Sequence, residues 1–138
     1  MTWSTSEIEY DNFPLLLRKP DYADIWEFKN KFTQLVRIEH LLENTKKDGL
    51  PEKSYNKLLA DFDHHMCTSL LSFDKGIIFL IETFAGKRNY YYYSLPNLII
   101  TNKVNKTSIN YKVTLETNYQ NDLDWGFLKE YPVELYSL

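Results

Sequence analysis

The chain of 138 residues has one cysteine and only four glycines. Because Cys67 has no second cysteine to pair with, no disulfide can form within the chain. No apolar run approaches the roughly 20 residues of a membrane-spanning helix, and residues 1–10 lack the basic and then apolar order of a secretion signal. We therefore expect a cytoplasmic protein that does not bind a membrane.

Positive charge is also scarce. The formal net charge is −3 and the isoelectric point is about 5.6. Such a chain has no overall positive field to attract a phosphate backbone or an anionic lipid surface. Phosphate-binding glycine loops, a nucleophile elbow and the zinc-protease signature are absent as well. The sequence therefore disfavours nucleic acid as a partner, favours a protein that is not an enzyme, and points to no cofactor.

Aromatic residues are abundant, at 16% of the chain, and 11 of them are tyrosines. With 43% hydrophobic residues, residues 1–138 can bury one core as a single domain. The stretch 74–95 is the centre of that prediction. Its run Ile77–Ile81 is typical of a strand buried on both faces, and Tyr90–Tyr93 predicts a second strand after a turn at Gly86.

The first 33 residues are predicted to form a hairpin and a connecting segment. Asp11 and Asn12 tolerate positive φ, which favours a two-residue turn between strands at 2–10 and 13–18. Residues 21–32 fit only an irregular segment or a short helix.

The rest of the chain, residues 34–138, alternates strands and helices. We expect strands at 34–42 and 110–118 and a helical turn capped by Asp124. The segment 97–109 fits either a helix or a strand, and its pattern favours a short helix. A helix from Pro51 to about residue 71 is predicted from an apolar stripe spaced by three and four, made of Tyr55, Leu58, Leu59, Phe62, Met66 and Leu70.

From residue 34 the predicted order is βαββαβ, the pattern of a ferredoxin-like α+β fold. The hairpin is then an addition to an antiparallel sheet. In this arrangement the helices cover one sheet face. The other face stays free for solvent, for the hairpin or for a partner, and it would carry Arg37, Glu39 and alternate tyrosines of 90–93.

Three short motifs give the chain a family resemblance. They are the turn at 47–51 (KDGLP), the strand entry at 86–93 (GKRNYYYY) and the segment 122–125 (DLDW), with Trp3 and residues 14–18 (PLLLR) in addition. The chain resembles a bacterial family catalogued as domain of unknown function 695. Similar domains resemble in fold the protein regulator B of ribonuclease E, an inhibitor that binds its enzyme. The resemblance implies no catalytic residue.

Residue types that could do chemistry occur in two groups. Asp61, Asp63, His64, His65 and Cys67 share the predicted helix, but they do not complete a four-ligand set, so no metal site is predicted. Cys67 beside Met66 is more typical of a buried thiol than of a nucleophile. A second group, Glu39, Glu82 and Glu116, lies on predicted strands, where exposed acids paired with lysine or arginine are the ordinary case.

An alternative function is RNA binding, with Lys87, Arg88 and the tyrosines of the third strand of the βαββαβ unit as a stacking surface. The net acidity argues against it. We predict instead a regulator, inhibitor or immunity-like protein that binds a protein partner. Its contact patch would contain Arg37, Arg88, Tyr91 and Tyr93, because Tyr and Arg are enriched in binding hot spots. A homodimer through the free sheet face, and a small enzyme using the carboxylates, stay open as alternatives.

Overall fold

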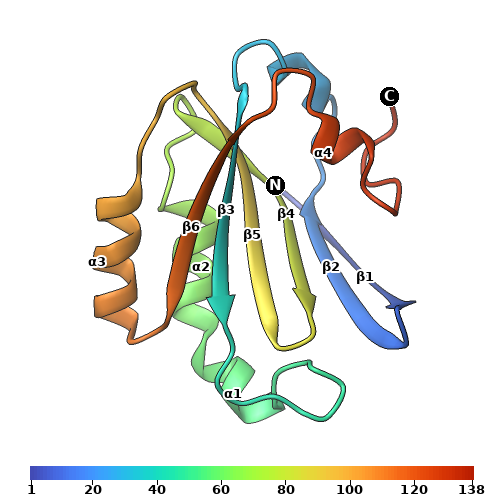
Figure 1. Cartoon of the computed structure of the whole chain (residues 1–138), viewed down its shortest axis with the longest axis vertical. Coiled ribbons are helices and arrows are strands. Elements are labelled where there is room, and N and C mark those ends of the chain that lie inside the picture. The colour runs from blue at the N-terminus through green and yellow to red at the C-terminus, as the bar shows by residue number, and fades with distance from the viewer.

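The computed structural model describes all 138 residues as one six-stranded sheet with four α-helices and a short 3-10 helix, η1 (Figure 1). The elements are β1 (Trp3–Tyr10), β2 (Phe13–Pro20), η1 (Ile25–Phe28), β3 (Gln34–Leu41), α1 (Lys53–Leu58), α2 (Ala60–Thr68), β4 (Gly76–Phe84), β5 (Lys87–Ser94), α3 (Thr101–Tyr111), β6 (Leu115–Asn121) and α4 (Gly126–Lys129). All strand pairs are antiparallel, in the order β1-β2-β4-β5-β3-β6. The predicted α+β class is confirmed. None of the helices is long and apolar enough to cross a bilayer.

Both predicted turns are two-residue hairpins. Asp11 and Asn12 have φ of 50° and 67°, and Ala85 and Gly86 have φ of 52° and 85°. Positive φ at both positions matches the twist of the flanking strands, which is why Asn, Asp and Gly are favoured there. The β4–β5 hairpin then sets the register of the tyrosine strand.

The sheet separates two hydrophobic clusters. The face that packs on α2 and α3, here called the helix face, buries the first cluster: Val36, Ile38, Phe62, Met66, Leu70, Ile78, Ile81, Tyr90, Tyr92, Ile100 and Val104. The opposite face, here called the α4 face, buries the second: Leu15, Leu17, Ile25, Phe32, Leu35, Ile77, Phe79, Leu80, Tyr91, Tyr93, Trp125, Leu128 and Leu135. Strands β4 and β5 contribute to both clusters, as expected for strands buried on both sides.

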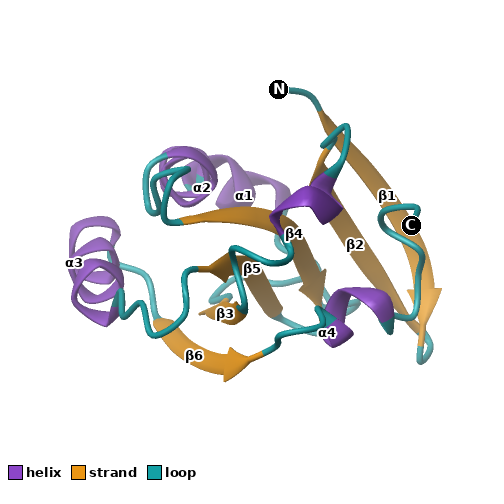
Figure 2. Ribbon diagram, turned by 90° about the horizontal axis from the view of Figure 1, so that it is seen from above, coloured by secondary structure: helices purple, strands orange, loops and turns teal.

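The prediction of a free second sheet face is wrong for most of the sheet. Figure 2 shows α1, α2 and α3 on one side of the sheet and α4 with the C-terminal segment on the other. Trp125, Leu128 and Leu135 from that segment are buried on the α4 face, together with Ile25 of η1. The C-terminal segment is short and is distant in sequence from most of the strands that it covers. Its apolar positions therefore did not reveal which sheet face they pack on.

The predicted helix from Pro51 to residue 71 is also corrected. It consists of α1 and α2, which are separated at Leu59, and Pro51 precedes them in a bridge to Thr45. The N–H of Leu59 bonds the carbonyl of Asn56, which tightens the chain at this point. As a result Leu58 is 83% exposed, whereas Leu59 lies in the core.

Two boundaries near the C-terminus differ from prediction. The predicted helix within 97–109 is present as α3, but it extends to Tyr111 and ends at Lys112 in the left-handed conformation. The strand expected at 110–118 is therefore β6, Leu115–Asn121. Asp122 rather than Asp124 caps α4, since its carboxylate accepts from the N–H groups of Gly126 (2.8 Å) and Phe127 (3.1 Å).

Candidate functional site

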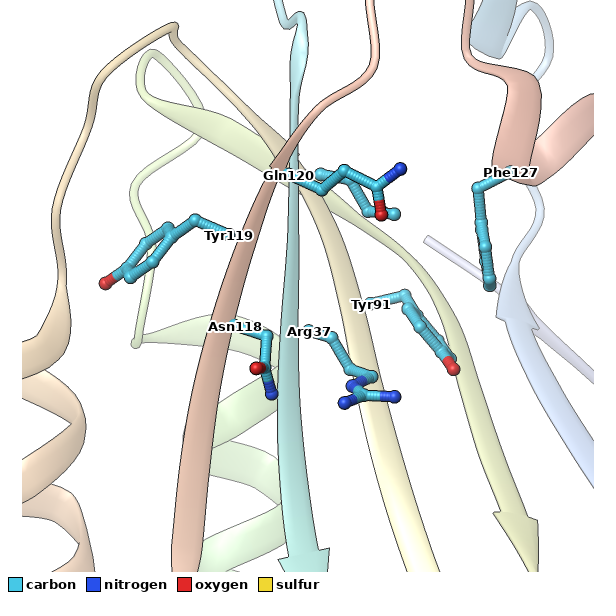
Figure 3. Close-up of a pocket in the computed structure, with 7 residues that line it drawn as sticks. Arg37, Tyr91, Asn118, Tyr119, Gln120 and Phe127 are labelled. Atoms are coloured by element: carbon cyan, nitrogen blue, oxygen red, sulfur yellow. The ribbon is translucent and has the colours of Figure 1, made fainter.

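A pocket of about 350 Å³ opens on the α4 face where α4 leaves β3 and β6 uncovered. Figure 3 shows it between the strands and Phe127 of α4. This pocket, here called the Arg37 pocket, is lined by Leu35, Arg37, Tyr91, Asn118, Tyr119, Gln120 and Phe127.

Sheet register brings its central residues together. Arg37 of β3 pairs with Tyr91 of β5 on one side and with Asn118 of β6 on the other. Directly opposed residues project from the same sheet face. The side chains of all three point to the same side of the sheet in Figure 3, whereas the ring of Tyr119 turns away.

The polar groups of the pocket are incompletely satisfied. The Nε of Arg37 and the Nδ2 of Asn118 are both buried donors without a hydrogen-bond partner. The Arg37 guanidinium has one carboxylate within reach, that of Glu39 at 3.8 Å, and its side chain is 40% exposed. Because a buried donor without an acceptor costs free energy, both groups favour a ligand that brings acceptor oxygens.

Aromatic rings form the apolar wall. The rings of Tyr91 and Phe127 lie 4.6 Å apart between centroids. The Tyr91 hydroxyl is 3.5 Å from Glu82, and burial raises the pKa of Tyr91 above its ordinary value, with the charge of Glu82 acting in the same direction. Tyr91 is therefore a neutral, ordered wall residue.

The three candidate carboxylates share one row across the sheet. Glu82, Asn89, Glu39 and Glu116 lie opposite one another on β4, β5, β3 and β6. Glu82 accepts hydrogen bonds from Asn89 at 3.0 Å and from Tyr131, and Glu39 lies 3.2 Å from Lys87. None of the three lines the Arg37 pocket. Their contacts are those of ordinary strand acids and do not form an acid–base pair around a cavity.

The structure separates two of the four residues of the predicted contact patch, Tyr93 and Arg88, from the other two. Tyr93 is fully buried, stacked between Phe79 and Trp125 at centroid distances of 4.6 and 4.2 Å. Tyr91 is 5% exposed, and Arg88, which is 4% exposed, lies on the helix face. Positions 88 and 91 have opposite parity on β5, so their side chains point to opposite faces. Only Arg37 and Tyr91 meet, in the Arg37 pocket.

The same burial removes the surface on which RNA bases would stack. Tyr90, Tyr91, Tyr92 and Tyr93 are each at most 5% exposed. Base stacking requires an accessible ring face. The tyrosine strand is therefore core and offers no exposed ring face on which a base could stack.

The helix face holds a polar cluster around Asp63 of α2. Its carboxylate accepts two hydrogen bonds from Arg18 of β2, at 2.6 and 2.9 Å, and one from the Tyr90 hydroxyl at 2.6 Å. Burial raises the pKa of the nearby Cys67 thiol to about 12, and the charge of Asp63 adds to this effect. A thiol in this environment is not a nucleophile at neutral pH.

The helix residues whose types could bind a metal do not converge. His65 lies 3.2 Å from the Thr107 hydroxyl of α3, whereas Asp63 is engaged by Arg18. The structure contains no group of three or more His, Cys, Asp or Glu side chains arranged to hold a metal ion.

Arg88 and His40 complete the polar cluster. The Arg88 guanidinium donates from Nε to Thr83 (2.9 Å) and from Nη2 to Asn56 of α1 (3.2 Å). His40 lies opposite Arg88 on β3, is 1% exposed, and has no hydrogen-bond partner on either ring nitrogen. Burial, with the positive charge of Arg88, lowers its pKa to about 4, so the ring is neutral at pH 7.

Sequence reasoning missed Asn118, Phe127 and Arg18 as site residues, and it considered Asp63 only as a metal ligand. The predicted strand at 110–118 already places Asn118 on the face opposite Thr117, but strand alternation alone does not show that Asn118 lines a pocket. The pairing of Arg18 with Asp63 joins residues 45 positions apart, and no local pattern signals it.

A scan against protein-family models finds no match. Searches of the curated proteins and of the solved structures find none either.

Proposed function

We propose that this protein is a non-catalytic binding protein, a regulator, inhibitor or immunity-like protein, that recognises a protein partner through the Arg37 pocket. The observation that carries the proposal is the pair of buried, unpartnered donors, Arg37 Nε and Asn118 Nδ2, in a pocket walled by Tyr91 and Phe127. Arg and Tyr set in a partly desolvated pocket are typical of binding hot spots.

The chemistry of the pocket supports a particular partner group. The Arg37 guanidinium and the Asn118 amide favour a carboxylate, and the aromatic wall favours the aliphatic part of the same side chain. We therefore propose that an aspartate or glutamate side chain of the partner enters the pocket. Gln120 is exposed at the pocket and can bond the partner's backbone.

The finer fold assignment and the family assignment stay proposals. The order β6-β3-β5-β4 among the strands of residues 34–138 supports the ferredoxin-like classification, with the β1–β2 hairpin added beside β4. Membership of the family of domains of unknown function 695 rests on the sequence motifs alone.

An affinity pull-down from the lysate of the source cells tests the function, with and without nuclease. Wild type, Arg37→Ala and Asn118→Ala are compared with Lys106→Ala, which removes a cation from an exposed position of α3. We expect a nuclease-resistant, stoichiometric protein with wild type and Lys106→Ala, and at least about tenfold weaker binding of the purified partner by Arg37→Ala.

Three outcomes would contradict the proposal. They are equal binding by all four proteins, recovery of nucleic acid alone, and recovery of nothing. If the partner is a second copy of this chain, size-exclusion chromatography of the purified protein shows a dimer that Arg37→Ala weakens.

A further inference from the structure

A second cavity lies on the helix face, away from the Arg37 pocket. It has a volume of about 240 Å³ and is lined by Leu16, Arg18, Asn56, Ala60, Asp63 and Arg88. Water occupies roughly 30 Å³ per molecule in the liquid, so this space holds a small ion together with a few waters. We call it the Arg18–Arg88 cavity.

Charge in this cavity is unbalanced. Asp63 is fully engaged, because one oxygen accepts from both Arg18 and Tyr90 and the other accepts from Arg18. Arg88 has no carboxylate within 4.0 Å and bonds only the neutral oxygens of Thr83 and Asn56. The two arginines and the one aspartate that line the cavity therefore leave it with a net positive charge.

That uncompensated cation is buried. Arg88 is 4% exposed, and its strand neighbours Thr83 and His40 are each 1% exposed. A buried charge is ordinarily paired, because removing it from water without a counter-ion is costly. Arg88 instead faces an open space that Arg18 also lines.

The donors that line the cavity belong both to the sheet and to a helix. They come from β2 (Arg18), β5 (Arg88) and α1 (Asn56). Each guanidinium uses only part of its N–H groups in the contacts described above. A tetrahedral oxyanion presents acceptor oxygens in several directions, and arginine binds phosphate with good geometry.

We propose that the Arg18–Arg88 cavity is a binding site for a phosphate group, either inorganic phosphate or the phosphoryl group of a small phosphomonoester. Arg88 neutralises the anion from inside the fold, and Arg18 and Asn56 hold it at the mouth, where Asn56 and Ala60 are exposed. This site is independent of the proposed protein-binding pocket, which lies on the opposite sheet face.

The decisive variant is Asn56→Asp. Because Asn56 Oδ1 already lies 3.2 Å from Arg88 Nη2, an aspartate there places a carboxylate beside Arg88 and supplies the missing counter-charge. Asn105→Asp adds the same charge at an exposed position of α3 and is the matched control. Asn56→Ala removes the amide without adding charge, and Ala60→Leu narrows the cavity without changing charge.

Binding is measured by calorimetry and by the NMR signal of the Arg88 Nε–H group, at constant ionic strength. The probes are inorganic phosphate, phosphoserine and acetate. We expect saturable phosphate binding by wild type and Asn105→Asp, weaker binding by Asn56→Ala, which loses one donor, and at least about tenfold weaker binding by Asn56→Asp and Ala60→Leu. Phosphoserine binding as tightly as phosphate identifies a phosphomonoester ligand, and its exclusion identifies the free ion.

The proposal is overturned if phosphate gives no saturable response, if acetate binds as tightly as phosphate, or if Asn56→Asp binds phosphate as well as Asn105→Asp does. None of these results bears on the Arg37 pocket, whose test uses different residues.

Discussion

Replacement of Asp63 by asparagine tests the electrostatic centre of the helix face. The substitution keeps the shape of the side chain but removes the charge that accepts two hydrogen bonds from Arg18. In the variant, Arg18 and Arg88 line the same cavity with no anion between them. We expect a large loss of stability without a change of fold.

The magnitude follows from burial. The side chains of Arg18 and Asp63 are 26% and 18% exposed, so water reaches the pair only in part. Breaking a buried ion pair costs about 3–5 kcal/mol, and the partial exposure places this pair near 3 kcal/mol. For a domain of this size, such a loss lowers the melting temperature by roughly 10 °C.

Urea unfolding followed by tryptophan fluorescence measures the effect, since Trp125 is fully buried in the native state. Asp124→Asn is the control. Its side chain is 88% exposed and lies 3.7 Å from Lys29, so its loss should change the free energy of unfolding by less than about 0.5 kcal/mol. If Asp63→Asn costs less than about 1 kcal/mol, the cluster is not the electrostatic centre argued here.

The pH dependence of the free energy of unfolding, measured for wild type and Asp63→Asn, tests the direction of the Asp63 pKa shift. Burial alone raises the pKa of Asp63, but the hydrogen bonds and charge of Arg18 outweigh it, so the pKa lies below its ordinary value. A lowered folded pKa adds stability above the unfolded pKa of about 3.9, and this stability is lost as pH falls through the folded value. The difference between wild type and Asp63→Asn should hold from pH 7 to near pH 4 and shrink below it. A difference that grows on acidification would refute the assignment.

Three further predictions concern the core, a turn and the thiol. Trp125→Ala should lower the free energy of unfolding by about 3–5 kcal/mol in urea titrations, because the indole is fully buried and stacks on Tyr93. Gly49→Ala should cost at least about 1 kcal/mol more than Gly86→Ala: both glycines have positive φ, but a Cβ at Gly49 would lie 2.8 Å from backbone whereas Gly86 faces open space. Equal costs would contradict this packing. Cys67 should react with a thiol reagent at pH 8 roughly 100- to 1,000-fold more slowly in the native than in the unfolded protein, because its pKa is raised to about 12; comparable rates would show an accessible thiolate.

Local rules explain which parts of the fold the sequence predicted. The turns at Asp11-Asn12 and Gly86 need positive φ, a property of the residues themselves. The break at Leu59 and the late start of β6 after Lys112 depend on tertiary packing that has no local signature. The helical stripe was therefore right for the buried Leu59 but wrong for the exposed Leu58.

The candidate site shows the same division. The alternation of side chains along a strand is enough to place Arg88 and Tyr91 on opposite faces of the sheet. Applied to the sequence, it would have shown that the predicted contact patch could not lie on one face. It is not enough to reveal that Trp125 covers Tyr93 or that Asp63 reaches Arg18, because both contacts join distant parts of the chain. The sequence shows which strand residues share a sheet face, but it does not show which distant segment packs on that face.

The tyrosine strand shows why composition misled the search for a binding surface. Each of its four hydroxyls donates to an oxygen inside the fold. On the helix face, Tyr90 donates to Asp63 and Tyr92 donates to the Met66 carbonyl. On the α4 face, Tyr91 donates to Glu82 and Tyr93 donates to Asp122.

A buried tyrosine is stable only when its hydroxyl is paired, so these four residues build a core with polar ends. The buried polar atoms left without partners are instead Arg37 Nε and Asn118 Nδ2 in the Arg37 pocket, Asn89 Oδ1, and both ring nitrogens of His40, and the charge of Arg88 on the helix face has no carboxylate beside it. We therefore base both proposed binding sites on unsatisfied polar groups and not on the abundant aromatic ones.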